Sequence, residues 1–286
     1  MTNYAWHRKQ LNLLSYLAPP IAGRIATRLF SLSRNETNKY REPLTPIGAK
    51  AIPLSQVNGS IKNIYLWGDS NGSQDKRGIV LLIHGWGTNC SSMFGFVQPL
   101  LENGRRVATF DAPAHGSTRG NYTTMTEWVE ATKAIIDRLS LEGPVNAVVA
   151  HSLGGIVCMA ACSKRDDVRQ LVLLAAPFSL TGVLDNWSRN FMKLRPTIHK
   201  QILKNLLQDN GVPVSHWDIG IHGKEWSQRM DIVHDVKDPI VDSSNAHRIS
   251  NALSDAKTNV HITQGLNHFK VLTNKKVQEL VANAIG

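Results

Sequence analysis

The sequence predicts an α/β fold with a mostly parallel central sheet and helices on both of its faces. Four continuous apolar runs have the composition of strands that are covered on both sides: 79–83, 107–110, 145–149 and 171–175. Helical patterns separate these runs, at about 92–102, 124–139 and 154–163. Strands that alternate with helices indicate right-handed βαβ units, which place the strands parallel in one sheet.

Shorter strands are expected before this central block. Residues 45–55 and 61–67 carry strand patterns, and Asn58-Gly59 between them is a turn signal. The polar residues 69–75 then predict a loop that leads into the first buried strand.

After the central block, residues 178–227 interrupt the alternation. They predict amphipathic helices, with one apolar stripe at 202–207. The strand pattern resumes at 230–233 and 260–263, and a final helix is expected at about 275–284. The sequence therefore predicts a core of residues 41–177 and 228–286 with a helical cap at 178–227.

The first 40 residues predict a helical extension. Leu11, Leu14 and Leu17 recur at helical spacing, and the pattern continues after an interruption at Pro19-Pro20. One interpretation is a helix packed on the domain, which is the more common arrangement and the one we favour. The other is a basic amphipathic segment, which would give residues 1–35 a weak contact with a membrane surface.

Length and composition limit the functional classes. The chain has 286 residues, 42% of them apolar and 19% charged, which suits one large α/β domain with an inserted subdomain. The formal net charge of +10 favours anionic partners, but lysines and arginines are spread along the chain. We therefore expect a solvated basic surface and no nucleic-acid partner; the oligomeric state cannot be inferred from this sequence.

Three cysteines, with no C-x-x-C pair, argue against a disulfide framework and favour a reducing compartment. Cys158 and Cys162 have the spacing of small core residues on a helix rather than metal ligands. No apolar run has the length of a membrane-spanning helix, and no signal peptide is recognised. We expect a cytoplasmic protein with neither a metal nor a cofactor.

A strand, a sharp turn and a helix are predicted around Ser152. The segment 150–155, Ala-His-Ser-Leu-Gly-Gly, follows the apolar run 145–149 and leads into another apolar stretch. Such a turn holds a serine away from both flanking elements and needs small neighbours, which Gly154 and Gly155 provide. Taken alone, the segment could be an ordinary glycine-rich turn with a surface serine. As a nucleophile, Ser152 would need a base and an acid elsewhere.

The base and the acid are expected beyond the carboxyl ends of later strands. His268 lies in a predicted loop at 264–269, directly after the strand at 260–263, whereas His261 lies within that strand. Asp238 follows the strand at 230–233, with Asp235 as its rival at the strand end and Asp242 as a weaker rival. The order Ser152, Asp238, His268 is that of a strand–turn–helix serine enzyme.

An oxyanion site needs two backbone N–H groups aimed at developing charge. Leu153, directly after the serine, would supply one of them. The loop 84–87, His-Gly-Trp-Gly, would supply the other from Trp86, because its glycines let the backbone approach a substrate. The Trp86 side chain and His151 are expected to line the substrate pocket, although packing is the commoner role of a tryptophan.

These motifs, in this order, resemble the serine-esterase branch of the α/β-hydrolase superfamily over residues 60–286. The segment 111–118 is similar to the family's D-x-P-G-x-G-x-S turn, with Ala114 and Thr118 as departures. Ala150 stands where glycine is usual, as in lipases with an A-H-S-x-G motif. The resemblance implies a Ser152–His268–Asp238 triad, oxyanion donors at Trp86 and Leu153, and a cap at 178–227.

The predicted function is cleavage of a small carboxylic ester with an apolar acyl part, through an acyl-enzyme intermediate. An acyl-CoA or acyl-carrier thioesterase is the first alternative, because a basic surface suits acidic carriers. A lipase is the second, because of the amphipathic first segment. A hydrolase-fold protein that binds a ligand without turnover is the alternative from another class.

Overall fold

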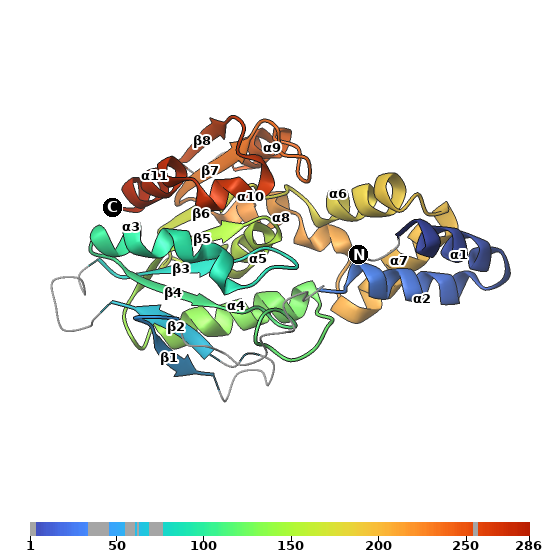
Figure 1. The fold of residues 1–286 in the computed structure, drawn as a ribbon, viewed down its shortest axis with the longest axis horizontal. Coiled ribbons are helices and arrows are strands. Elements are labelled where there is room, and N and C mark those ends of the chain that lie inside the picture. Colours follow the sequence, from blue (N-terminus) through green and yellow to red (C-terminus); the bar gives the residue numbers. More distant parts are fainter. Residues whose placement is uncertain (1–3, 34–45, 55–60, 62, 69–76, 254–256) are drawn as a thin grey trace.

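The computed structural model describes residues 4–33, 46–54, 61, 63–68, 77–253 and 257–286. The predicted turn at Asn58-Gly59 and the loop at 69–75 lie outside these residues. The chain forms one twisted eight-stranded sheet with a helical arm at one side (Figure 1). Its strands are β1 Lys50–Pro53, β2 Asn63–Trp67, β3 Ile79–Ile83, β4 Arg106–Phe110, β5 Val145–His151, β6 Gln170–Leu174, β7 Arg229–Asp235 and β8 Thr258–Thr263.

The sheet is mostly parallel, as the sequence predicts. Its strand order is β1-β2-β4-β3-β5-β6-β7-β8. The β1–β2 and β2–β4 pairs are antiparallel, and every pair from β4 to β8 is parallel. The central strands β3, β4 and β6 are buried at every position, which explains their continuous apolar runs.

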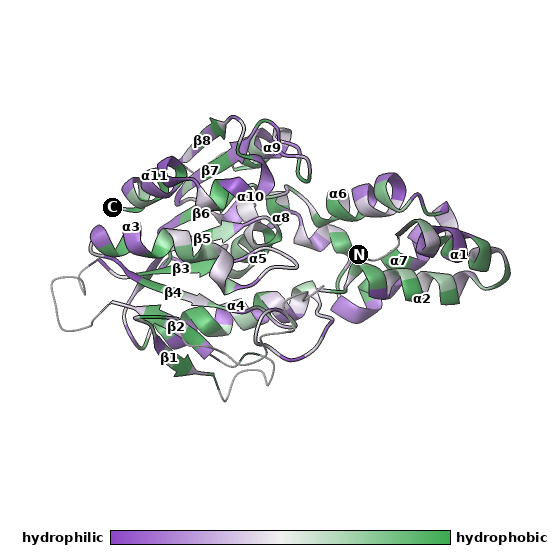
Figure 2. Cartoon of the chain, in the orientation of Figure 1, coloured by the Kyte–Doolittle hydropathy of each residue, from purple (hydrophilic) through white to green (hydrophobic). Residues whose placement is uncertain are grey.

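Helices cover both faces of the sheet and bury two apolar layers. One layer lies under η3 Cys90–Phe96, α3 Val97–Glu102, α10 Asn267–Thr273 and α11 Lys275–Ile285. The other lies under α4 Met125–Leu139, α5 Leu153–Cys162 and α9 Ser244–Ala252. Figure 2 shows that the central strands are mainly apolar, whereas the helices beside them combine apolar and polar residues. The two layers hold the carboxyl ends of the parallel strands at one edge, where the candidate site lies.

The segment predicted as a cap is helical but divides into two parts. The first part protrudes from the core and contains α6 Leu180–Asp185, η4 Asn186–Phe191 and α7 Pro196–Asn210 (Figure 1). The second part packs back against α5 and α9 and contains η5 Val214–Trp217, α8 Ile219–His222 and η6 Gly223–Glu225.

The first segment of the chain packs on this protruding part. It forms α1 Tyr4–Leu17 and α2 Pro19–Phe30, which meet at the predicted proline interruption and lie beside α7 (Figure 1). A Cβ atom placed on Gly23 would lie 2.2 Å from the Cβ of Gln201, so α2 and α7 touch at their backbones. Asn205 donates a hydrogen bond to Thr27 Oγ1 at 3.0 Å in the same interface. The described residues 4–30 of this segment therefore pack on the segment predicted as a cap. We call α1, α2, α6, η4 and α7 together the arm.

Candidate active site

The turn between β5 and α5 holds Ser152 in a strained conformation. Its φ of 52° and ψ of −127° lie in a region that non-glycine residues rarely adopt. Two glycines permit this turn. A Cβ on Gly154 would lie 2.5 Å from the carbonyl oxygen of His84, and one on Gly155 would lie 2.6 Å from the Cβ of Ala176. Ser152 itself stays partly exposed.

Ser152, His268 and Asp238 form a continuous hydrogen-bonded relay. The Ser152 hydroxyl lies 3.0 Å from His268 Nε2, and His268 Nδ1 lies 2.7 Å from Asp238 Oδ2. Ser152 follows β5, Asp238 lies just beyond β7, and His268 lies just beyond β8. The parallel strands end at the same edge of the sheet, which brings together three residues far apart in sequence. The prediction of a loop around His268 is wrong, because it is the second residue of α10.

Three hydrogen bonds and one close histidine contact hold the buried carboxylate of Asp238. Its Oδ1 accepts the backbone N–H groups of Ile240 at 2.8 Å and Val241 at 3.0 Å. Its Oδ2 accepts a hydrogen bond from His268. His234 Nε2 lies 2.9 Å from the backbone carbonyl of Val241 and 3.4 Å from Asp238 Oδ2. Burial alone would raise the pKa of Asp238, but the close contact with His234 and the hydrogen bonds from His268 and Val241 outweigh burial and hold the pKa well below its usual range. The carboxylate is therefore ionised and fixed in orientation.

The two rival carboxylates, Asp235 and Asp242, accept hydrogen bonds from backbone N–H groups. Asp235 accepts the N–H groups of Lys237 and Leu266 and the hydroxyl of Thr263, so it ties the end of β7 to the loop after β8. Asp242 accepts the N–H of Ser244 at 2.9 Å. Neither carboxylate contacts the relay.

His151 supports the relay from behind. It is 1% exposed, and its Nε2 lies 2.9 Å from the backbone carbonyl of His268. Burial, with the nearby His268 as a second cause, lowers the pKa of His151 to about 3, so the ring is neutral and Nε2–H donates. His151 thus has almost no surface for a substrate, and its contact fixes the backbone of the candidate base.

The loop after β3 lies directly against the serine turn. A Cβ on Gly85 would lie 3.1 Å from the Cβ of Ser152 and 2.8 Å from His151 Nδ1, so only glycine fits at this position. Leu153 is the first residue of α5, where a backbone N–H has no partner within the helix. The two segments that carry the predicted oxyanion donors, Trp86 and Leu153, therefore lie beside the serine, and the role of their N–H groups stays a prediction.

The Trp86 side chain is packed rather than free. Its ring is half-buried and lies against His115, with centroids 5.1 Å apart, and Trp128, with centroids 6.0 Å apart. Its indole N–H donates to the backbone carbonyl of Leu32 at 3.2 Å. These contacts fix the loop from which the second oxyanion donor would come.

Residues 30–33 join the arm to this loop, a connection that no sequence motif indicates. Phe30 packs on Trp187 with ring centroids 5.2 Å apart. Ser33 donates its hydroxyl to the carbonyl of Ala114 at 2.6 Å and its N–H to the carbonyl of Asn121 at 3.0 Å. We call residues 30–33 the strap.

The turn at 111–118 braces the strap and the oxyanion loop. Asp111 accepts the N–H groups of Cys90 and Ser117, at 2.9 and 2.8 Å. A Cβ on Gly116 would lie 2.2 Å from the Asp111 carboxyl carbon, so this position requires glycine. Ala114 has a φ of 60°, the left-handed conformation that favours glycine, and its carbonyl receives Ser33.

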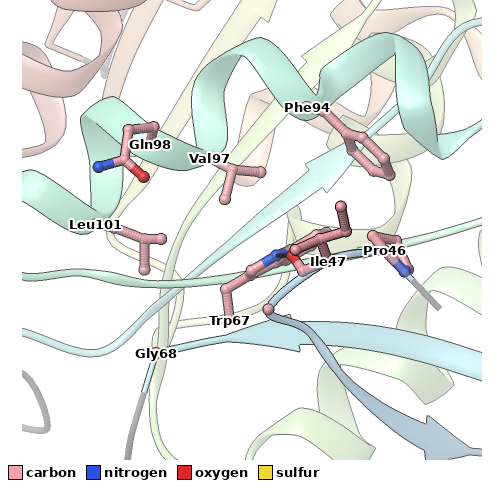
Figure 3. A pocket seen from close by; sticks show the side chains of 9 residues that line it. Pro46, Ile47, Trp67, Gly68, Phe94, Val97, Gln98 and Leu101 are labelled. Atoms are coloured by element: carbon pink, nitrogen blue, oxygen red, sulfur yellow. Dashed lines mark hydrogen bonds between the residues drawn. The ribbon is translucent and has the colours of Figure 1, made fainter.

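A shallow hollow of about 740 Å³ lies elsewhere, between β2 and α3 (Figure 3). Trp67, Phe94 and Leu101 form much of its apolar lining, and Gln98 is its polar side chain. It contains no residue of the relay and no titratable side chain, so we assign it no chemistry. In the described part of the chain, no cluster of three histidine, cysteine or acidic side chains could hold a metal ion. Among those same residues, no helix is both long and apolar enough to span a bilayer.

Residues 80–253 match the sequence profile of the alpha/beta hydrolase family. The chain belongs to the alpha/beta hydrolase family. The match runs from β3 into the segment after α9 and so includes the serine turn and Asp238.

Comparisons with individual alpha/beta hydrolases agree with this assignment. A curated relative, Probable esterase D14L of Oryza sativa subsp. japonica, is 29% identical over 108 residues, which span 36% of this chain and 40% of that protein. The Pyrococcus furiosus esterase Pf2001 superposes with a TM-score of 0.62 at 16% identity, covering 82% of this chain and 89% of that one. Est1E from Butyrivibrio proteoclasticus, solved with ferulic acid, gives 0.60 at 19%, covering 83% and 96%. At these identities the structural similarity establishes the fold alone.

Proposed function

We propose that this alpha/beta hydrolase cleaves carboxylic esters through a covalent acyl-enzyme. The observation that carries the proposal is the relay from Ser152 through His268 to Asp238, with links of 3.0 and 2.7 Å. A hydroxyl becomes a useful nucleophile at neutral pH when a neutral imidazole accepts its proton. A carboxylate on the far nitrogen fixes the imidazole tautomer and stabilises the imidazolium that forms.

In the first half-reaction, Ser152 Oγ bonds to the ester carbonyl carbon while its proton passes to His268 Nε2. The π electrons of the carbonyl move to its oxygen, and the N–H groups of Trp86 and Leu153 would donate hydrogen bonds to the resulting oxyanion. Removing one such donor typically slows catalysis by about 10²- to 10³-fold. The tetrahedral intermediate then expels the alcohol, which takes the proton from His268 and leaves Ser152 acylated.

Water completes the cycle. His268 Nε2 accepts a proton from water, whose oxygen attacks the acyl carbon on Ser152. The second tetrahedral intermediate releases the carboxylic acid and returns the proton to Ser152. His151 and His234 act as positioning residues in this scheme, because one holds the His268 backbone and the other contacts the Asp238 carboxylate.

The substrate is proposed to be a small ester with an apolar acyl part. The predicted cap, residues 178–227, would supply the apolar side chains that receive the acyl part. Phe178 follows β6 closely and lies under the guanidinium of Arg248, 4.5 Å from its ring centroid. The packing of α1 and α2 on α7 supports a composite cap, in which residues 1–33 complete the segment 178–227. The chemistry requires neither a metal nor a cofactor.

The relay suits thioesters as well as esters, because both are acyl donors. One observation favours the acyl-CoA or acyl-carrier alternative: lysines and arginines outnumber acidic residues in the arm, and those substrates are anionic. Initial rates on p-nitrophenyl esters of rising chain length, measured beside acyl-CoA substrates, separate these possibilities. Thioester turnover that far exceeds every ester would replace the carboxylesterase assignment, and a preference for emulsified long-chain esters would favour a lipase.

A fluorophosphonate probe tests the nucleophile itself. We expect the wild type to be labelled at Ser152 and the Ser152→Ala variant to remain unlabelled. Ser227→Ala is the matched control, because Ser227 is exposed at the surface and should leave labelling unchanged. A wild type that takes no label would instead support a binding protein without turnover.

A further inference from the structure

The outer surface of the arm exposes an unusual number of large apolar side chains. Six lie on α1 and α2 and are between 41% and 86% exposed: Trp6, Leu13, Tyr16, Leu17, Ile21 and Ile25. Leu13 and Leu17 belong to the last turns of α1 and Ile21 to the first turn of α2, so they lie on either side of the turn between the two helices. That turn is the end of the arm farthest from the sheet (Figure 1). We call the residues 13–21 the tip. Single exposed apolar residues are ordinary, but a group of this kind marks a surface that another phase or molecule covers.

The inner faces of the same helices are already used. Ala22, Gly23, Ala26 and Thr27 of α2 are buried, and Leu11 and Ser15 are the buried residues of α1. The apolar residues of the tip therefore cannot turn inward without losing the contacts of α2 with α7. Packing within the chain therefore leaves these apolar side chains exposed to solvent.

The arm carries a net positive charge. Residues 1–33 and 178–210 contain nine lysines and arginines against two aspartates, which accounts for seven of the chain's ten net positive charges. Both aspartates are paired with arginines of the arm: Asp209 with Arg24 and Asp185 with Arg189. The arm also exposes lysines on and just before α7: Lys193, Lys200 and Lys204.

From these two observations we propose that the arm binds the surface of anionic phospholipid bilayers. The apolar side chains of the tip would enter the boundary between headgroups and acyl chains, and the flanking lysines and arginines would contact lipid phosphates. A second copy of this chain fits this surface poorly, because a symmetric contact would bring two basic arms together. This surface lies apart from the relay, so the inference does not depend on the proposed esterase activity.

Sedimentation of the full-length protein with vesicles tests this proposal. We would use vesicles of phosphatidylglycerol and phosphatidylcholine, compare them with phosphatidylcholine alone, and repeat both at low and high salt. The inactive Ser152→Ala protein should bind as well as the wild type, which separates this test from the test of catalysis. We expect binding to the anionic vesicles only, and weaker binding as salt screens the charges.

Two pairs of variants locate the surface. The double variant Leu17→Glu/Ile21→Glu should lower the vesicle partition coefficient at least about 10-fold, whereas Leu141→Glu, an exposed position on the core, should leave it unchanged. Lys200→Glu/Lys204→Glu should lower the coefficient by a similar factor, whereas Lys275→Glu/Lys276→Glu on α11 should not. All four positions at the tip and on α7 are exposed, and melting curves verify that each variant is folded.

Three outcomes would overturn the proposal. The first is an absence of binding to anionic vesicles at low salt, and the second is equal binding by the tip variants and their controls. The third is a wild type that is dimeric by light scattering while Leu17→Glu/Ile21→Glu is monomeric, because the tip would then be covered by a second copy.

Discussion

The indole N–H of Trp86 donates a hydrogen bond to the backbone carbonyl of Leu32, 3.2 Å away. This contact joins the strap to the loop proposed to supply an oxyanion donor. The position of the proposed oxyanion donor thus depends on a segment more than 50 residues earlier in the chain. Through Phe30, the same strap contacts Trp187 of the arm.

Replacing Trp86 with phenylalanine should lower kcat for p-nitrophenyl esters by about fivefold. The ring keeps its packing, but the loss of one hydrogen bond of about 1 kcal/mol lets the loop move. Trp67→Phe is the matched control, because the Trp67 indole N–H also donates to a backbone carbonyl, that of Ile47, far from the relay. An equal loss of kcat in both variants would assign the effect to general destabilisation.

Asp235, which ends β7, and Asp238, which lies just beyond it, should behave differently. Asp238→Asn should lower kcat by about 10³- to 10⁴-fold, because an amide cannot stabilise the imidazolium or select the correct His268 tautomer. Asp235→Asn should lower the melting temperature, because it weakens the acceptor for Leu266 and Lys237, while kcat stays within about threefold. If Asp235→Asn abolished activity and Asp238→Asn did not, the two roles would have to be exchanged.

Gly23 should be essential for the arm. A Gly23→Leu side chain would meet Gln201, so we expect the free energy of unfolding in urea to fall by about 3 kcal/mol. Arg28→Leu provides the control on the same helix, because its side chain faces solvent and should change the stability little. A stable Gly23→Leu protein would mean that α2 does not pack on α7 at this point.

Two buried histidines predict loss of stability in acid. Burial lowers the pKa of both His115 and His151 to about 3, from an ordinary value of 6.5. Between these values the unfolded chain binds protons that the folded chain does not, so stability falls as pH falls. The contribution is about 2 kcal/mol per histidine between pH 7 and pH 5. Urea unfolding at these two pH values measures it, and His115→Gln should reduce the difference; an unchanged difference would exclude His115 as a source.

Local patterns predicted the core of the fold well. The apolar run 79–83 is β3, and the predicted final helix at 275–284 is α11 within one residue. The helices α9 and α10 were not predicted, because they are short and mixed in polarity: α9 buries only Ala246 and Ile249. Asn267 opens α10 with a φ of 54° and accepts the N–H of Phe269, which is information that a loop pattern does not contain.

The candidate relay was predictable because its members follow strands in a fixed order. The supporting residues were not, because their roles depend on contacts between distant parts of the chain. In the sequence, His234 has the position of an ordinary strand residue. Only the fold shows that its Nε2 lies 3.4 Å from Asp238 Oδ2. Likewise, nothing in the sequence of residues 30–33 indicates that the backbone carbonyl of Leu32 accepts a hydrogen bond from the Trp86 indole.

The proposed mechanism requires a covalent acyl group on Ser152. The most direct test is to mix the protein rapidly with a p-nitrophenyl ester, quench with acid and analyse the products by mass spectrometry. We predict a burst of about one p-nitrophenol per protein molecule when deacylation is slower than acylation, together with an acyl adduct on the peptide that contains Ser152. Single-turnover quenching would capture the same adduct if deacylation were the faster step. Ester turnover without any adduct, or an unchanged rate in Ser152→Ala, would contradict the proposed mechanism.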